Sequence, residues 1–411
     1  MWLSNRWLWR VIFIAAAIYF VVRGPWRAVH DSGDFLLVYT AARSWLHGVN
    51  PYIAADLAIT ARNGGIPLTE TDFVISPSVY LPPALTLLTP LALLPWAVAK
   101  TIWLACLLAL TLWNVVVFAR LAKQWAVPVA SFLLAFAPVH SGFSKGQPSV
   151  LVCGLIFLSV FTANPDIAGL LLGIAACFKP QLAIGFFLLA AGQRQFRKLI
   201  VACAVGLIAS GIGVAFVVPG WYPALSANVR NIVGSVSGLN SASGPISWYQ
   251  LVNLHILIPE ALTRTSFELI AYAIIVAITA IAAVRAADWR MSTALIASAT
   301  VLIGYHRFYE AQIMWFDVPA ILFLSQKPLS YILWALHAVF LVPGQTMIAL
   351  RVGMQTNNPL WALLLRHETI AVVLIWMIFA WITIRRREAG QASAPAWMKS
   401  AVQSIIVSVS P

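Results

Sequence analysis

The sequence predicts an all-α membrane protein, a polytopic bundle of transmembrane helices. Hydrophobic residues make up 61% of its 411 positions and charged residues only 9%, whereas a soluble domain is roughly 45–50% apolar and about 25% charged. The apolar residues form long runs that short polar segments separate. Lys and Arg gather in those short segments, as they do in the cytoplasmic loops of membrane proteins.

Composition also limits the kinds of partner and ligand that the sequence predicts. The net charge of +13 suits the topology rule for membrane proteins better than nucleic-acid binding, because no basic cluster is interleaved with stacking aromatic residues. Four cysteines lie in apolar runs without paired spacing, so the sequence predicts neither a disulfide nor a zinc site. They are Cys106, Cys153, Cys177 and Cys203.

A helix needs about 20 apolar residues to cross the hydrocarbon, and the sequence offers about twelve candidate spans, in a range of roughly 10–13. They cover residues 7–23, 97–119, 126–141, 148–163, 167–178, 181–192, 198–217, 262–284, 291–304, 308–325, 329–349 and 360–384. Pro148, Pro165 and Pro180 interrupt the region 148–192. Broken helices in a membrane normally line a polar cavity, so we expect one there.

The first apolar run resembles a signal peptide, but Arg23-Gly24-Pro25-Trp26 follows it in place of a small-residue cleavage site. We therefore expect a retained first span. The segment 81–95 is apolar and short and holds four prolines, and we treat it as non-spanning. With the N-terminus inside, more than half of the 26 basic residues then fall in short inside segments or in the tail, as the positive-inside rule requires.

This topology predicts one transmembrane domain over residues 1–387 and a cytoplasmic tail over 388–411. Both termini are then cytoplasmic. The first extracytoplasmic loop covers 24–96 and carries amphipathic surface helices, and the second covers 218–261. The unusual polar residues all fall on this outer side, although only the basic residues were used to choose the orientation.

The first loop holds the clearest candidate for chemistry. Asp34 opens a predicted amphipathic helix directly after a span, so its carboxylate lies at the membrane surface, where it can act as a general base toward a lipid-borne hydroxyl. The alternative is a helix N-cap, and Asp31 is a rival carboxylate three residues away. Tyr39 and Arg43 follow on the same segment.

Short outer turns carry further candidates. Tyr80 precedes a Pro-Pro pair that could simply mark a helix start. Lys145 and Gln147 flank Gly146 in a turn that either caps the next helix or presents an ammonium and an amide to a phosphate or sugar. Lys179 interrupts an apolar run. It either snorkels to the surface or meets a phosphate.

The segment 305–310 also breaks an apolar region. His306 and Glu310 share a helical face, but further metal ligands are lacking, so no metal site is predicted. Arg307 and Glu310 could instead pair with each other. Asp317, seven residues further on, is interpreted as a buried structural polar residue.

Several of these stretches resemble the family-87 glycosyltransferases, multispanning enzymes of the GT-C class. GDFLLVYTAARSWLHGVNPY (33–52) is similar to the hallmark of this family. Residues 79–103 resemble its next segment, with Tyr-Leu-Pro-Pro where the family usually has Tyr-Pro-Pro. Residues 146–160 and 167–198 resemble its Gly-Gln and Lys-Pro segments. YHRFYE (305–310) is similar to a late His-containing motif, but it departs from the pattern because an Asp is expected near Glu310.

The resemblance implies a GT-C fold and an inverting transfer of a sugar, with mannose the best-known case, from a polyprenyl-phosphate donor. The acceptor would be a glycolipid or glycan at the periplasmic face of a bacterial inner membrane. By motif match Asp34 is the catalytic base, while Lys179, His306 and Arg307 hold the donor phosphate. The remaining candidates would bind substrate. These are Asp31, Tyr39, Arg43, Tyr80, Lys145, Gln147, Tyr309 and Glu310.

Because the donor is itself a membrane lipid, neither a nucleotide fold nor another cofactor is expected. Consistent with this, the sequence has no GxGxxG motif after a strand pattern and no Asp-x-Asp motif. Two other functions stay open. A transporter or flippase of lipid-linked sugars would also suit broken helices, although related halves are not apparent. A polysaccharide ligase or polymerase is the second alternative.

Overall fold

The computed structural model of the protein describes residues 6–31, 33–66, 77–234, 251–258, 262, 266–286, 288–304, 306–324, 327–344 and 364–385. Within these ranges the regular secondary structure is helical, and the β-type pairing is limited to an isolated bridge between Leu251 and Arg307. The prediction of an all-α fold is therefore confirmed. Residues 235–250 of the second predicted loop and the tail 388–411 lie outside the described residues.

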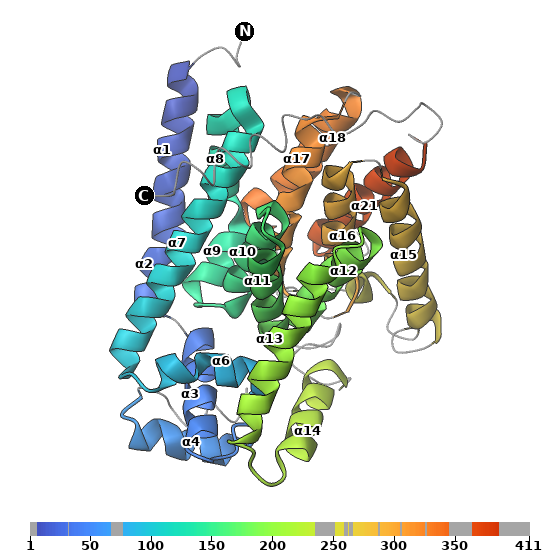
Figure 1. The fold of residues 1–411 in the computed structure, drawn as a ribbon. Helices are drawn as coiled ribbons and strands as arrows, with labels where there is room; N and C mark the ends of the chain where they lie inside the picture. Colours follow the sequence, from blue (N-terminus) through green and yellow to red (C-terminus); the bar gives the residue numbers. More distant parts are fainter. Residues whose placement is uncertain are drawn as a thin grey trace.

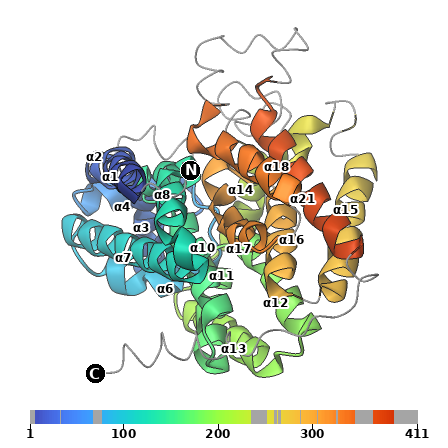
Figure 2. The same cartoon turned by 90° about the horizontal axis from the view of Figure 1, so that it is seen from above.

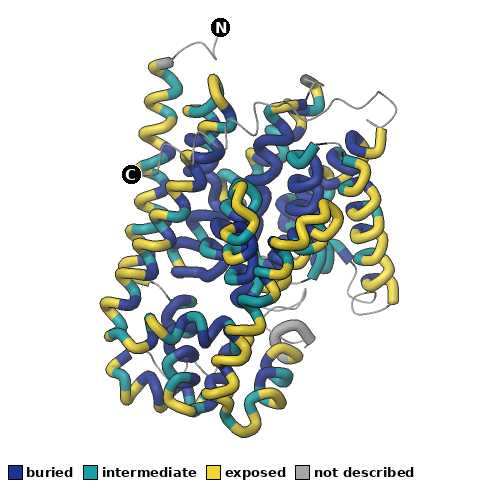
Figure 3. Tube along the Cα trace, viewed as in Figure 1, coloured by how far each residue is buried: buried dark blue, intermediate teal, exposed yellow. Residues whose placement is uncertain are grey.

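Five helical stretches in the described part of the chain are long and apolar enough to cross a bilayer. Their helices are α1 (Arg6–Arg23) with α2 (Pro25–His30), α7 (Trp96–Ala122) with α8 (Ala126–Ala135), α13 (Phe196–Val214), α15 (Ser266–Arg285) and α21 (His367–Arg385). Large apolar side chains on α1, α13 and α15 are exposed, and Figure 3 colours much of these rim helices as exposed. A soluble protein would hide such surface, and lipid accommodates it. The chain is thus a polytopic membrane protein.

Shorter helices fill the space between these long ones. They are α9 (Ala137–Ser144), α10 (Pro148–Phe161), α11 (Pro165–Phe178), α12 (Pro180–Gly192), α16 (Trp289–Leu302), α17 (Asp317–Leu322) and α18 (Lys327–Ala338), with 3-10 helices η2 (Lys123–Trp125), η4 (Leu254–Leu257), η6 (Phe308–Phe316) and η7 (Val339–Leu341). Seen from above, α10 and α17 lie near the centre and α1, α13 and α15 lie toward the rim (Figure 2). The count of about twelve spans stays a prediction.

Proline starts three consecutive helices, as the sequence predicts for the region 148–192. Pro148, Pro165 and Pro180 occupy the first helical positions of α10, α11 and α12, respectively, where the missing N–H costs nothing.

The predicted span 308–325 is not one continuous α-helix. It begins as the 3-10 helix η6 and continues as the short helix α17, and nearly all of it is buried. Asp317 accepts a hydrogen bond from His337 Nε2 at 2.9 Å inside the bundle, in keeping with its predicted structural role.

Four helices gather at one end of the bundle, where α2 finishes and α7 begins (Figure 1). They are α3 (Gly33–Leu46), α4 (Ala54–Asn63), α6 (Pro82–Ala92) and α14 (Trp221–Gly234). Helix α6 has 11 residues and is about 16 Å long at 1.5 Å per residue, too short to cross the hydrocarbon. It lies across the long helices, consistent with our treatment of 81–95 as non-spanning.

Candidate active site

Asp34 lies in the first turn of α3, which begins at Gly33, so it is not the N-cap of that helix. Its neighbour Phe35 is fully buried and stacks on Trp103 of α7, with 4.5 Å between ring centroids. This stacking fixes the start of α3 against a long helix. The Asp34 carboxylate, on the next position, accepts a hydrogen bond from the side-chain amide of Gln147.

Gln147 comes from the turn between α9 and α10, and several hydrogen bonds hold that turn against α3 and α7. Gly146 adopts a φ of +65°, which glycine allows without strain. Its carbonyl accepts from Trp103 Nε1 at 2.9 Å, and the Phe35 N–H donates to the Lys145 carbonyl at 3.3 Å. As a result, the turn presents its amide to Asp34 rather than capping α10 with it.

The two acidic candidates of the first loop have different partners. Asp31 forms an ion pair with Lys145 at 2.5 Å, and both side chains are about half exposed. Asp34 is paired with the neutral amide of Gln147 instead, and the described residues place no cation within 4.0 Å of its carboxylate. A carboxylate of this kind can accept a proton from a substrate, whereas Asp31 is better suited to hold Lys145 in place.

A second group of polar residues lies in the bundle interior. Lys179 occupies the break between α11 and α12, where Pro180 starts the next helix, and it forms an ion pair with Glu310 of η6. The other Glu310 oxygen lies 2.7 Å from His306 Nδ1, and the Ser149 hydroxyl donates to Glu310 at 3.2 Å. Lys179, His306 and Glu310 are all buried. Pairing of Glu310 with Arg307, which the sequence also allows, stays a prediction.

The backbone before η6 explains how His306 reaches this position. Gly304 has a φ of +85°, a conformation that L side chains rarely adopt, and it turns the chain at the end of α16. The His306 carbonyl then accepts from the Val252 N–H at 3.0 Å, and Asn253 donates to the Gly304 carbonyl at 2.6 Å. A segment of the second predicted loop therefore fixes the backbone at His306.

The turn between α9 and α10 joins the two groups of residues. Gln147 binds Asp34, and Ser149, two residues further on, binds Glu310. A Cβ at Gly142 would lie 2.7 Å from Val150 Cγ2 and 3.3 Å from Tyr309 Cβ, so α9 packs directly on this turn and on η6. The same turn therefore links the Asp34 carboxylate to the interior group of Lys179, His306 and Glu310.

Tyr80 lies between the two groups. Burial raises the pKa of its phenol, and the negative charges of Asp34 and Glu310 raise it further, while Arg307 lowers it. Charges from both groups thus act on one hydroxyl, which stays protonated at neutral pH. The Tyr52 hydroxyl donates to the Tyr80 carbonyl at 2.8 Å and holds this segment in place.

Tyr39 and Arg43 point along α3 toward the start of α7. The Tyr39 hydroxyl donates to the Leu94 carbonyl at 2.6 Å, and Arg43 donates to Tyr39 and to the Ala92 carbonyl at 3.1 and 3.2 Å. Both side chains therefore brace α3 against the turn after α6. Tyr309 presents its ring to Lys179, with the ammonium 5.4 Å from the ring centroid. Substrate contact by any of these three remains a prediction.

Two buried polar atoms of the site have no hydrogen-bond partner among the described residues, Gln147 Oε1 and His306 Nε2. Leaving such an atom unpaired costs roughly 1–3 kcal/mol, so their presence in this region favours a site that a polar ligand completes.

The sequence analysis did not identify Ser149 as a candidate. A single hydroxyl at the start of an apolar helix carries no pattern that would single it out. The described residues place no group of three His, Cys, Asp or Glu side chains where a metal ion could bind.

These features define a class of protein. A carboxylate in the first turn of α3 is linked through one turn to a buried lysine, histidine and glutamate, within a polytopic α-helical membrane protein. That combination suits an enzyme that transfers a group between membrane-borne substrates.

Comparison with known proteins agrees with this class and identifies the enzyme family. The model of glycosyltransferase family 87 matches residues 79–305, more than half of the chain, and the protein belongs to that family. The protein is therefore a membrane glycosyltransferase. The matched range includes Tyr80, Gln147 and Lys179, while Asp34 and the segment from His306 onward lie outside it.

A curated relative comes from Mycolicibacterium smegmatis, the polyprenol-phosphate-mannose-dependent alpha-(1-2)-phosphatidylinositol pentamannoside mannosyltransferase. It is 31% identical over 182 residues, which cover 43% of this chain and 42% of that protein. The chain thus aligns with less than half the length of this relative. No solved structure matches the chain.

Proposed function

We propose that the protein transfers a sugar, with mannose the first candidate, from a polyprenyl-phosphate donor to a glycolipid or glycan acceptor. The named dependence of the M. smegmatis relative on polyprenol-phosphate-mannose supports this choice of donor. The outward-facing apolar surface supports it as well, because a lipid-borne donor reaches the site from the bilayer.

In the proposed reaction Asp34 is the general base. An acceptor hydroxyl gives its proton to the carboxylate, and its oxygen forms a bond to the anomeric carbon. The bond from that carbon to the donor phosphate oxygen breaks on the opposite side, which inverts the configuration. The Gln147 amide supports this role because it orients the carboxylate without neutralising its charge.

The interior cluster stabilises the leaving group. The donor phosphate carries one negative charge, and the released polyprenyl phosphate gains a second. Lys179 is already paired with Glu310, and His306 offers Nε2, which has no hydrogen-bond partner among the described residues, as a further contact for the phosphate. Glu310 holds the opposite ring nitrogen at 2.7 Å, which directs Nε2 toward the ligand. Arg307 is the third proposed phosphate partner, and each well-placed donor contributes about 3–4 kcal/mol in such sites.

The reaction is placed at the periplasmic face of a bacterial inner membrane, with both termini cytoplasmic. The distribution of basic residues supports this orientation. Lys123, Arg194 and Arg285 lie at the ends of α7, α12 and α15 that are remote from α3. Basic residues such as Arg23, Arg27 and Lys100 also lie on the α3 side. The positive-inside rule concerns short segments between spans, and in this orientation the short segments that are rich in Lys and Arg lie inside.

The single observation that carries the proposal is the α9–α10 turn, which binds Asp34 through Gln147 and Glu310 through Ser149. The test compares Asp34→Asn with Asp31→Asn, which makes the same change on the rival carboxylate. We expect Asp34→Asn to lower kcat by about 10²–10⁴-fold, the contribution of a general base, while Asp31→Asn keeps most of the activity. Full activity in Asp34→Asn, or equal losses in both variants, would refute the assignment.

A further inference from the structure

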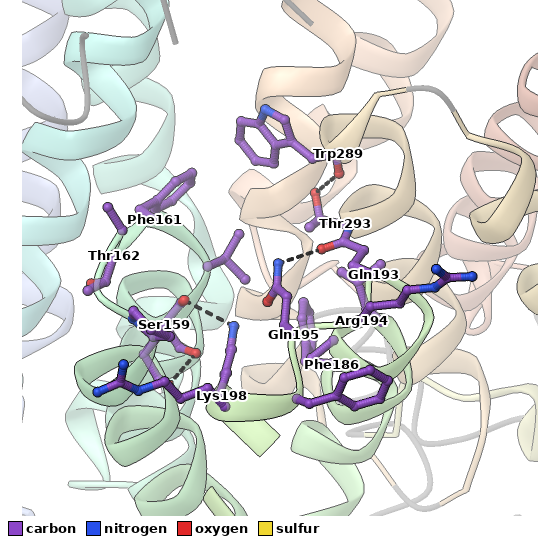
Figure 4. A pocket seen from close by; sticks show the side chains of 18 of the residues that line it. Ser159, Phe161, Thr162, Phe186, Gln193, Arg194, Gln195, Lys198, Trp289 and Thr293 are labelled. Atoms are coloured by element: carbon purple, nitrogen blue, oxygen red, sulfur yellow. Dashed lines mark hydrogen bonds between the residues drawn. The ribbon is translucent and has the colours of Figure 1, made fainter. Parts of the chain in front are cut away.

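A cavity with both polar and apolar lining residues lies at the end of the bundle opposite to α3. Its volume is about 480 Å³, and it forms where α10 and α12 end and where α11, α13 and α16 begin. Arg194 is among the lining residues. Figure 4 shows Lys198 and Ser159 on one side, Gln193 and Gln195 on another and Trp289 above them, while the Arg194 guanidinium points away from Lys198. None of these residues belongs to the proposed active site.

Lys198 is the unusual member of this cavity. It is only 6% exposed, and its ammonium donates to the Ser159 carbonyl at 3.1 Å. The described part of the chain places no carboxylate within 4.0 Å of this ammonium. Its neighbour Arg197 differs, since it forms a two-pronged pair with Asp166 at 2.5 and 2.6 Å. A lysine ammonium has three N–H donors, so Lys198 keeps two that this bond does not use.

The position of Lys198 makes an anion favourable. It lies in the first turn of α13, which starts at Phe196, and the dipole of a helix disfavours a cation at that end. Burial adds a cost, because a charged group without a counter-charge loses hydration. Capping the Ser159 carbonyl at the end of α10 explains one hydrogen bond. It explains neither the two remaining donors nor the cavity in front of them.

An apolar groove lies next to this cavity. Its volume is about 760 Å³, and it runs between α12, α15 and α16. Aliphatic side chains such as Ile184, Leu188 and Val276 line it. Leu189, Gln193 and Trp289 line both the cavity and the groove, so the two are adjacent. A ligand with an anionic head and a hydrocarbon chain matches this shape.

We propose that the cavity binds an anionic phospholipid of the surrounding bilayer. The lipid phosphate accepts hydrogen bonds from Lys198, Arg194 lies at the rim as a second cation, and one acyl chain occupies the groove. The site lies at the membrane face opposite to Asp34. It is therefore a lipid-binding site separate from the transfer reaction, and it does not depend on the proposed donor or acceptor.

Native mass spectrometry of the purified full-length protein tests this site. Delipidated protein in detergent is titrated with phosphatidylglycerol, with phosphatidylcholine of the same chains, and with inorganic phosphate. We expect one saturable phosphatidylglycerol adduct at concentrations where phosphatidylcholine binds far less. Equal binding of the two lipids would overturn the proposal. So would displacement of phosphatidylglycerol by inorganic phosphate at millimolar concentration, because the site would then hold a free anion.

Variants locate the adduct. Lys198→Met should weaken it by about tenfold or more, as expected when a charge-assisted hydrogen bond is lost from a buried position. Lys123→Met is the matched control, because it removes a lysine at the same end of the bundle but outside the cavity, and it should bind normally. If both variants bind alike, the proposed site is wrong.

Two surface variants keep the test valid if Lys198→Met fails to fold. Arg194 is exposed at the rim, and Arg194→Gln should weaken phosphatidylglycerol binding without affecting the fold. Leu188 is 62% exposed in the groove, and Leu188→Trp should obstruct the acyl chain. Unchanged binding in both would contradict the proposal.

Discussion

Replacing Glu310 by Gln should destabilise the protein by about 3 kcal/mol. Glu310 is 2% exposed and contacts Lys179, His306 and Ser149 at once. Gln keeps one oxygen that can accept from Ser149 or His306, but it cannot offset the ammonium of Lys179. Removing one partner of a buried ion pair typically costs about 3–5 kcal/mol. The lower end of that range applies here, because the Tyr309 ring still faces the ammonium and contributes roughly 0.5–1 kcal/mol.

The double variant Lys179→Met/Glu310→Gln provides the control. It leaves no buried lysine without a counter-charge, and the Gln side chain can still bind Ser149 and His306. We therefore expect it to be more stable than Glu310→Gln alone, with a coupling energy of about 2 kcal/mol between the two positions. Denaturant unfolding of all four proteins in the same detergent measures this cycle. If Glu310→Gln costs less than about 1 kcal/mol, or if the two changes are additive, the ion pair is not the organising contact of this site.

Three further changes test other parts of the site. Gly142→Val should lower stability by about 1–3 kcal/mol and reduce activity, because even its Cβ would overlap Val150 and press on Tyr309; thermal unfolding and turnover together measure this, and an unaffected variant would mean that α9 is free to move. Tyr80→Phe should reduce kcat/KM without altering the pH profile near neutrality, since burial raises the pKa of the phenol and only its neutral form is present there. Because the pKa is raised in the folded protein, any folding stability linked to this proton is complete below the ordinary pKa of 10.0 and is lost only at higher pH. Gly304→Val should destabilise the turn before His306 by about 1–2 kcal/mol, because Gly304 has a φ of +85°. The matched control is Gly206→Val on α13, where a Cβ meets no neighbouring atom. Activity should fall more in Gly304→Val than in this control.

The sequence predicts the fold well where the signal is local. Apolar runs of sufficient length become long helices, and Pro148, Pro165 and Pro180 mark helix starts because proline lacks the N–H that a helix interior requires. The placement of Asp34 directly after the first span also follows from local order. These rules fail for the stretch 308–325, since a buried 3-10 helix and a buried α-helix carry similar apolar composition.

The partners within the site could not be predicted in this way. Lys179 and Glu310 are 131 positions apart, and Asp34 and Gln147 are 113 apart. Each of these residues interrupts an apolar stretch of the sequence, but no periodic pattern indicates which of them contact each other. The tertiary packing of α9, α10 and η6 decides that. It also changes the interpretation of Lys179, which the sequence offered as a free cation for phosphate and which the structure pairs with a carboxylate.

The central claim is that this membrane glycosyltransferase takes its sugar from a lipid phosphate. The most direct measurement supplies purified protein in liposomes with radiolabelled polyprenyl-phosphate mannose and a glycolipid acceptor, and then separates the products. Our account predicts labelled glycolipid together with an equal amount of unlabelled polyprenyl phosphate, and neither in Asp34→Asn. If the labelled donor crosses the bilayer intact, the protein is a flippase. If label is transferred only from a nucleotide sugar, the proposed donor is wrong.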